Sequence, residues 1–470
     1  MASLQNKKET CLVLMAAFLL HIGFFAYDVA TGFAPFVRGD RSLSRLQALL
    51  AFDRAPVNDA LSTLVANPVI PGEYFAQWVA YAFGGQAGIV IFQIALFLAS
   101  VWALCRTVSV LFPWKSYTAL VGLVYVALPQ NVVFTHQFVT EAIVTPLLVF
   151  FAYFYVMYSK YGRTRQLLMC GLTLGLVIGV RPVFAIVPPT LVLLHLVYRR
   201  YLWRSAALTV AVICGLSILP MAGWVATYTA QTGKLGFTSG VANLGWNLRS
   251  KVWFVYTRNQ LEKPAEIKAY SEYGDLYQDS DGISVGRFLQ LAAEHPILFA
   301  RPAIIDMLTL FRGNISKLIV DYFGISRDQG VKEWRDILSK EGVVGELGLL
   351  MRSKGTFLSV ATEFLASVIT ALCIATAILF AIFCLARPKA VSGEFGPISY
   401  GMILVQCAIL FSVFASSQIV DQSQARLRHP AEAGLILLLV FLWRYRTARK
   451  PQPEIAHVKQ LFAGAHQADR

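Results

Sequence analysis

Residues 86–105, QAGIVIFQIALFLASVWALC, contain no charged side chain and are long enough to cross a lipid bilayer as one helix. Nine further apolar runs occur along the 470-residue chain. Lipid offers the backbone no hydrogen-bond partner, so a spanning segment must be a helix or part of a closed barrel, and these runs lack the alternation of barrel strands. We therefore predict membrane-spanning helices at residues 11–30, 86–105, 116–129, 140–158, 166–180, 183–198, 206–229, 357–385, 398–417 and 431–443.

The overall composition agrees with a membrane protein. Hydrophobic residues make up 56% of the chain and charged residues only 14%, whereas soluble domains carry about 25% charged residues. The first apolar run is too long for a signal peptide and is not followed by a small-residue cleavage site, so we expect it to be retained. The predicted fold is an all-α polytopic membrane protein with about ten transmembrane helices.

The chain has a formal net charge of +14, and the positions of its basic residues are informative. In a soluble protein it would suggest a nucleic-acid partner. Here the basic residues gather in alternate connections between spans, and basic loops mark the cytoplasmic side of a membrane. We therefore expect no nucleic-acid partner and predict that both chain ends are cytoplasmic. The basic residues are Lys7, Lys8, Arg106, Lys115, Lys160, Arg163, Arg165, Arg199, Arg200, Arg204, Arg387, Lys389, Arg444, Arg446, Arg449 and Lys450.

The spans divide the chain into four parts. Residues 1–229 are predicted to form an N-terminal transmembrane module, which includes a first outside loop over 31–85. Residues 230–356 form a larger extracytoplasmic region, 357–447 form the C-terminal transmembrane helices, and 448–470 form a cytoplasmic tail. The spacing of apolar residues predicts amphipathic surface helices in both outside regions.

Several common catalytic motifs are absent from the sequence. It contains no P-loop, no dinucleotide-binding glycine motif, no H-E-x-x-H zinc motif and no G-x-S-x-G nucleophile motif. Gly171, Gly175 and Gly179 recur at every fourth residue, which predicts a helix-packing face. His21 lies in an apolar span and is expected to be a packed residue, whereas His136 is expected to be a solvated loop residue.

Ionisable residues are predicted to gather at the outer membrane boundary. Asp40 follows the first span, Glu141 begins the fourth, and Arg181 lies in the turn between the fifth and sixth. Arg426 and Arg428 precede the last span. Charges near membrane depth are costly and are therefore candidates for function. These residues also have structural interpretations. Asp40 could be a helix N-cap, and Glu141 could stabilise the first turn of its helix through the helix dipole. Arg426 and Arg428 could extend to lipid headgroups.

The chemistry that suits this set is transfer from a lipid-linked phosphate. Guanidinium groups hold phosphate by paired hydrogen bonds, so Arg41, Arg181, Arg426 and Arg428 are the expected substrate-binding residues. A carboxylate can accept a proton from an attacking hydroxyl. A lipid donor enters sideways from the bilayer, so a pocket at the membrane boundary is accessible to it.

These motifs resemble the integral-membrane glycosyltransferases of the C-type superfamily, particularly the group that includes protein O-mannosyltransferases and the bacterial lipid A aminoarabinose transferase. The resemblance rests on four features spread over residues 11–445. They are Val37-Arg38-Gly39-Asp40 with Asn67-Pro68 and Pro71-Gly72 in the first loop, Leu128-Pro129 followed by Thr140-Glu141, a glycine-rich helix ending in Arg181-Pro182, and Arg426-Leu427-Arg428-His429-Pro430, which is similar to the family's Arg-Tyr-Arg-x-Pro pattern.

The resemblance implies a polyprenyl-phosphate sugar donor, inversion at the anomeric carbon, and Asp40 as general base. It places Glu141 at a second acidic position, where the family contacts the acceptor or a divalent metal ion; no other cofactor is expected. The expected acceptor is a lipid, a glycan such as lipopolysaccharide, or a protein of the cell envelope. The expected location is the bacterial inner membrane, in contact with membrane lipids and with the active site on the extracytoplasmic side.

Other classes of membrane protein remain open. The chain could be a transporter or flippase of a lipid-linked sugar, or a glycan ligase or polymerase. Transporters usually show polar or broken helices near the middle of the membrane and a repeat between their halves. The sequence shows neither feature clearly, which favours the glycosyltransferase.

Overall fold

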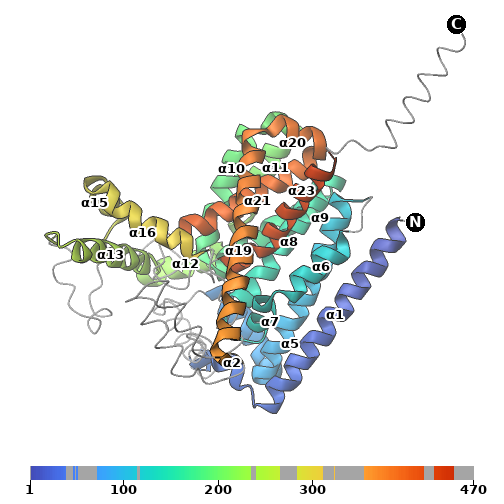
Figure 1. The fold of residues 1–470 in the computed structure, drawn as a ribbon, viewed down its shortest axis with the longest axis horizontal. Coiled ribbons are helices and arrows are strands. Elements are labelled where there is room, and N and C mark those ends of the chain that lie inside the picture. The colour runs from blue at the N-terminus through green and yellow to red at the C-terminus, as the bar shows by residue number, and fades with distance from the viewer. Residues whose placement is uncertain are drawn as a thin grey trace, which may run out of the picture.

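The computed structural model describes residues 2–38, 46–47, 49–50, 71–113, 117–233, 240–264, 283–310, 322, 354–417 and 428–448. Throughout these ranges the regular structure is helical, with no strand (Figure 1). The main bundle contains α1 (Ala2–Ala30), α5 (Pro71–Leu111), α6 (Thr118–Ala127), α7 (Pro129–Thr135), α8 (Glu141–Tyr161), α9 (Thr164–Val180), α10 (Val187–Val197), α11 (Ala206–Leu216), α12 (Leu219–Thr232), α19 (Lys354–Ala386), α21 (Pro397–Ser417) and α23 (Glu432–Ala448). Short helices connect them: α2 (Ala34–Arg38), η1 (Pro182–Ile186), η2 (Arg199–Tyr201), α20 (Pro388–Phe395) and η3 (His429–Ala431).

The length and composition of these helices confirm an all-α membrane fold. Each of the ten predicted spans coincides with a helix or helix pair. In the described part of the chain six helices are long and apolar enough to cross a membrane, and a seventh is added if the bent pair α6–α7 forms one span. Helix α9 and the segment 182–197 are apolar but shorter. The count of ten crossings therefore stays a prediction.

Helix α5 is divided at Gly84-Gly85. Both residues depart from helical geometry, and Gly85 has φ of 60°, a left-handed conformation that glycine adopts without strain. The second part of α5 begins where the predicted span 86–105 begins. The aromatic-rich stretch 73–84 lies in the first part.

The helices α6 and α7 meet at an angle of 58°. Leu128, between them, has an extended backbone because the ring of Pro129 disfavours helical geometry in the residue before it. The chain therefore turns away from the α6 axis and reaches α8 through α7 and a short turn at residues 136–140.

The three spaced glycines form the packing face that the sequence predicts. A β-carbon at Gly175 would lie 2.3 Å from the carbonyl oxygen of Ser217, and one at Gly171 would lie 2.4 Å from the β-carbon of Leu216. Helix α9 thus approaches the α11–α12 junction more closely than any larger residue permits.

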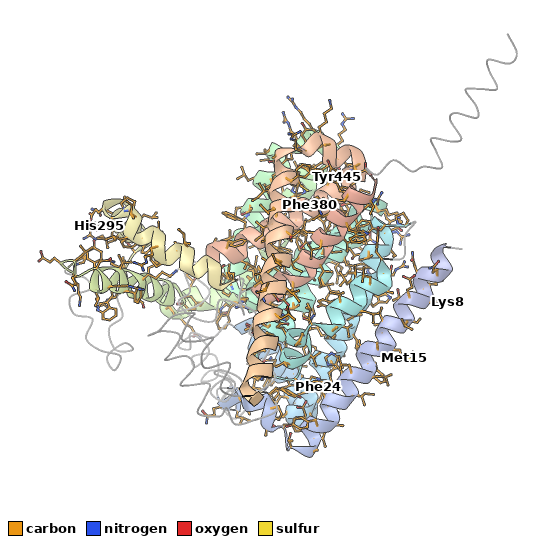
Figure 2. All side chains as sticks on the ribbon, in the orientation of Figure 1. Lys8, Met15, Phe24, His295, Phe380 and Tyr445 are labelled. Atoms are coloured by element: carbon orange, nitrogen blue, oxygen red, sulfur yellow. The ribbon has the colours of Figure 1, made fainter. Side chains whose placement is uncertain are left out.

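Apolar side chains fill the interior of the bundle (Figure 2). Phe380 of α19 and Tyr445 of α23 pack with ring centroids 6.4 Å apart. At the same end of the bundle the Arg444 guanidinium lies 5.6 Å from the ring centroid of Phe112 and 5.5 Å from that of Phe395. These three residues come from connections predicted to be cytoplasmic, so the fold brings those connections together.

Candidate active site

The segment of residues 129–141 is the centre of the polar contacts at the opposite end of the bundle. It contains α7, the turn 136–140 and the first residue of α8, and every residue from 130 to 141 is buried. The turn is held by two contacts: the Gln93 side-chain amide donates to the carbonyl oxygen of Gln137 at 3.3 Å, and the rings of Phe36 and Phe138 pack with centroids 5.4 Å apart.

Glu141 and Arg181 form an ion pair. Nη1 of Arg181 donates to Oε1 of Glu141 at 3.1 Å, and the hydroxyl of Thr140 donates to Oε2 at 3.2 Å. The Glu141 side chain is 1% exposed, whereas that of Arg181 is 15% exposed. Arg181 has an extended backbone before Pro182 and ends α9, so the sequence prediction of a sharp turn here is confirmed. Two predicted site residues that are forty positions apart are therefore in contact.

Arg428 is buried and held by a carboxylate. Its Nε and Nη2 both donate to Oε1 of Glu432 at 3.2 Å, and its Nη1 donates to the carbonyl oxygen of Leu310. Nδ1 of His429 lies 3.0 Å from the other oxygen of Glu432. The Arg428 side chain is only 3% exposed. The alternative in which Arg428 extends to lipid headgroups is therefore wrong, while its role in phosphate binding stays a prediction.

A second polar group lies around Asp28. Oδ2 of Asp28 is 2.5 Å from Nδ1 of His136, and Oδ1 accepts a hydrogen bond from the Tyr322 hydroxyl at 2.7 Å. Nε2 of His136 is 2.9 Å from Nδ1 of His21. An ionised carboxylate only accepts, so Nδ1 of His136 is the donor to Asp28. Which of the two rings donates in the His136–His21 contact depends on their tautomers. Burial and the hydrogen bond to Asp28 raise the pKa of the Tyr322 hydroxyl, which stays protonated and able to donate at neutral pH.

The burial of His136 corrects the sequence prediction. The residue was expected to be solvated, but its side chain is fully buried, because the bend before Pro129 folds α7 and the following turn onto the bundle. His21 is a packed residue as expected, with its ring 4.8 Å from that of Phe97. Asp28 was missed altogether. The sequence did contain an indication of its role, because Asp28 is an acidic residue inside the apolar run 11–30, where a charge is costly unless it is paired.

Phe134 connects the two polar groups. Its ring packs edge-on against that of His429, with centroids 4.8 Å apart, and it belongs to the same apolar cluster as Tyr322. The pair Glu141–Arg181 follows seven residues later in the chain. Segment 129–141 thus touches all three groups of ionisable residues at this end.

Three predicted site residues, Asp40, Arg41 and Arg426, lie outside the described residues. Most of the first outside loop, where an amphipathic helix was predicted, also lies outside them. Within the described ranges no group of three or more His, Cys, Asp or Glu side chains is arranged to hold a metal ion. The divalent ion implied by the resemblance stays a prediction.

Residues 68–224 match the model of a family described as dolichyl-phosphate-mannose-protein mannosyltransferases. The matched stretch begins just before α5 and ends within α12, so it includes His136, Glu141 and Arg181. No individual curated protein and no solved structure matches the chain. The family match confirms the resemblance drawn from the sequence and supports a multi-pass membrane glycosyltransferase.

Proposed function

We propose that this membrane glycosyltransferase moves a sugar from a polyprenyl-phosphate donor to an acceptor on the extracytoplasmic face of the membrane. The observation that carries the proposal is the ion pair between Glu141 and Arg181, which lies inside the family-matched stretch and at the predicted outer end of the bundle. The pair supports the proposal because the Glu141 carboxylate orients a guanidinium group, the kind of group that binds phosphate.

The reaction has a simple balance of bonds and protons. A hydroxyl oxygen of the acceptor attacks the anomeric carbon of the sugar, and the bond from that carbon to the phosphate oxygen breaks. The hydroxyl proton passes to a carboxylate, for which Asp40 is the proposed acceptor. The sugar is transferred with inversion, and the polyprenyl phosphate leaves with an additional negative charge.

Arginines are the proposed stabilisers of that charge. Arg181 is the more exposed partner of its ion pair, which makes it more accessible to a phosphate than Glu141 is. The carboxylate of Glu141 holds the guanidinium in one orientation, and Glu432 does the same for Arg428. A preorganised donor of this kind is effective because it does not reorient as charge develops. Arg41 and Arg426 complete the proposed phosphate contacts.

A reconstituted assay tests this function. The purified chain is placed in proteoliposomes with a polyprenyl-phosphate-linked sugar, and release of polyprenyl phosphate is measured with an envelope lipid extract as acceptor. We expect acceptor-dependent release in wild type and its loss in Glu141→Gln. Movement of intact donor between leaflets, with no release of polyprenyl phosphate, would instead support the transporter.

A further inference from the structure

Three helices outside the bundle form a small unit with its own core. They are α13 (Gly240–Arg258), α15 (Val285–Glu294) and α16 (Pro296–Thr309), and we call them the arm. Val252, Val255, Leu291 and Phe299 are buried between them. The arm projects to one side of the bundle (Figure 1), and His295, where α15 meets α16, is far from the bundle helices (Figure 2).

The arm is joined to the bundle at the end that carries the candidate active site. Leu310, directly after α16, is buried and accepts a hydrogen bond from Arg428. The arm also follows α12, which runs toward the predicted outer boundary. Its place in the chain and this contact put the arm level with the predicted outer surface of the membrane.

Large apolar side chains are exposed on the arm. Ile297 is 83% exposed, Leu289 60% and Ile304 55%. Ile297, Arg301 and Ile304 are four and three residues apart, so they share one face of α16. An exposed face of this kind is unfavourable in water and is typical of helices that lie in a membrane interface.

A cleft between α13 and α16 brings two arginines together beside this face. Its lining includes Arg258, Asn259 and Arg301, together with Phe254 and Pro302. The Arg258 guanidinium lies 5.5 Å from the ring centroid of Phe254. Within the described residues neither arginine forms an ion pair.

We propose that the arm lies on the outer leaflet and that Arg258 and Arg301 bind the phosphate of a phospholipid headgroup. Two guanidinium groups offer paired hydrogen bonds to phosphate oxygens. Ile297 and Ile304 on the same surface enter the acyl boundary beside that headgroup. The arm is thus a membrane-bound support separate from Glu141 and Arg181, and the inference does not depend on sugar transfer.

The test measures contact between the arm and lipid in the full-length protein. Cys11 and Cys373, the exposed native cysteines, are replaced by Ser, and a fluorophore is attached to Ile297→Cys. The control carries the fluorophore at Glu294→Cys, an exposed polar position of α15. Both proteins are placed in phosphatidylcholine nanodiscs, and phosphatidylglycerol with a spin label near its headgroup is added as quencher.

We expect strong quenching at position 297 and little at position 294. Each Arg→Ala change at positions 258 and 301 should raise the spin-labelled phosphatidylglycerol needed for half-quenching about fivefold, which corresponds to ~1 kcal/mol per basic residue at a charged membrane surface. The double variant Arg258→Lys/Arg301→Lys should lose less affinity for the lipid, because lysine keeps the positive charge. Strong quenching at position 297 in this variant would show that the arm still folds and reaches the membrane. Equal, weak quenching at both positions would overturn the proposal. If both Ala variants need the same amount of spin-labelled phosphatidylglycerol for half-quenching as wild type does, the proposed phosphate site is wrong.

Discussion

Nδ1 of His136 lies 2.5 Å from Oδ2 of Asp28, and both side chains are fully buried. The pair joins α1 to the turn between α7 and α8, residues that are 108 positions apart in sequence. It therefore fixes the position of segment 129–141, from which Glu141 extends toward Arg181.

We predict that His136→Ala destabilises the protein by about 3 kcal/mol or more, because it removes the histidine partner of the buried Asp28 carboxylate. Thermal unfolding in detergent, followed by tryptophan fluorescence, measures the change. Asp28→Asn combined with His136→Gln replaces the charged pair by two amides and should lose less stability than His136→Ala alone. A His136→Ala protein as stable as wild type would show that the pair has no structural role.

Arg181→Ala should lower kcat for sugar transfer by about 10²-fold, the usual effect of losing one preorganised donor to a developing negative charge. Arg181→Lys should fall between wild type and Arg181→Ala, since lysine keeps the charge but lacks the planar fork. Arg163→Ala, an exposed arginine in a predicted cytoplasmic connection, is the matched control and should be silent. Equal activity of Arg163→Ala and Arg181→Ala would contradict the role of Arg181.

Arg428→Ala should weaken donor binding, and Arg426→Ala should do so less strongly. Lysine at position 428 should restore part of the affinity. Because Arg428 is paired with Glu432, Glu432→Gln is the necessary comparison: it frees the arginine from its carboxylate but keeps its charge. Binding of a labelled donor lipid measures both. If Glu432→Gln and Arg428→Ala weaken binding equally, the arginine acts only as the partner of Glu432.

Asp40→Asn should abolish transfer while expression and thermal stability stay close to wild type. Loss of a general base typically costs about 10²–10⁴-fold in rate, and asparagine can still cap a helix. Sugar-transfer activity of membranes at matched protein level gives the answer. Full activity in Asp40→Asn would reject Asp40 as the base and make Glu141 the next candidate.

The predicted topology is tested by cysteine accessibility. Single cysteines at Thr63 and Ser239 should react with a membrane-impermeant thiol reagent added from outside, because both lie in regions predicted to be extracytoplasmic. Ser159, at the predicted cytoplasmic end of the fourth span, is the matching inside position. Labelling of Thr63→Cys or Ser239→Cys only after the membrane is opened would contradict the location of the whole site.

The sequence predicts the helices well because long apolar runs and glycine or proline breaks are local signals. The start of the second part of α5 follows from Gly84-Gly85, and the turn at Arg181 follows from Pro182. The contact between Glu141 and Arg181 is consistent with the sequence prediction, which places both residues at the outer ends of neighbouring helices.

Other contacts depend on the path of the chain in space. The burial of His136 results from the 58° bend between α6 and α7, and no local pattern gives the size of that bend. The hydrogen bond from Tyr322 to Asp28 joins residues 294 positions apart. Glu432, by contrast, lies four residues after Arg428, the spacing of a helical ion pair, and could have been recognised from the sequence.

The break in α5 has a consequence for protein engineering. Because the backbone leaves helical geometry at Gly84-Gly85, the rotational phase of residues 71–83 is not transmitted to residues 86–111. Inserting or deleting one residue before the break turns the first part by about 100° and leaves the membrane-crossing part in phase with α6 and α8. A change in length before the break should therefore cost less than the same change after Gly85: before the break it moves only the shorter packed face around Gln77 and Ala80, whereas after it the packed face of the crossing helix rotates out of the bundle.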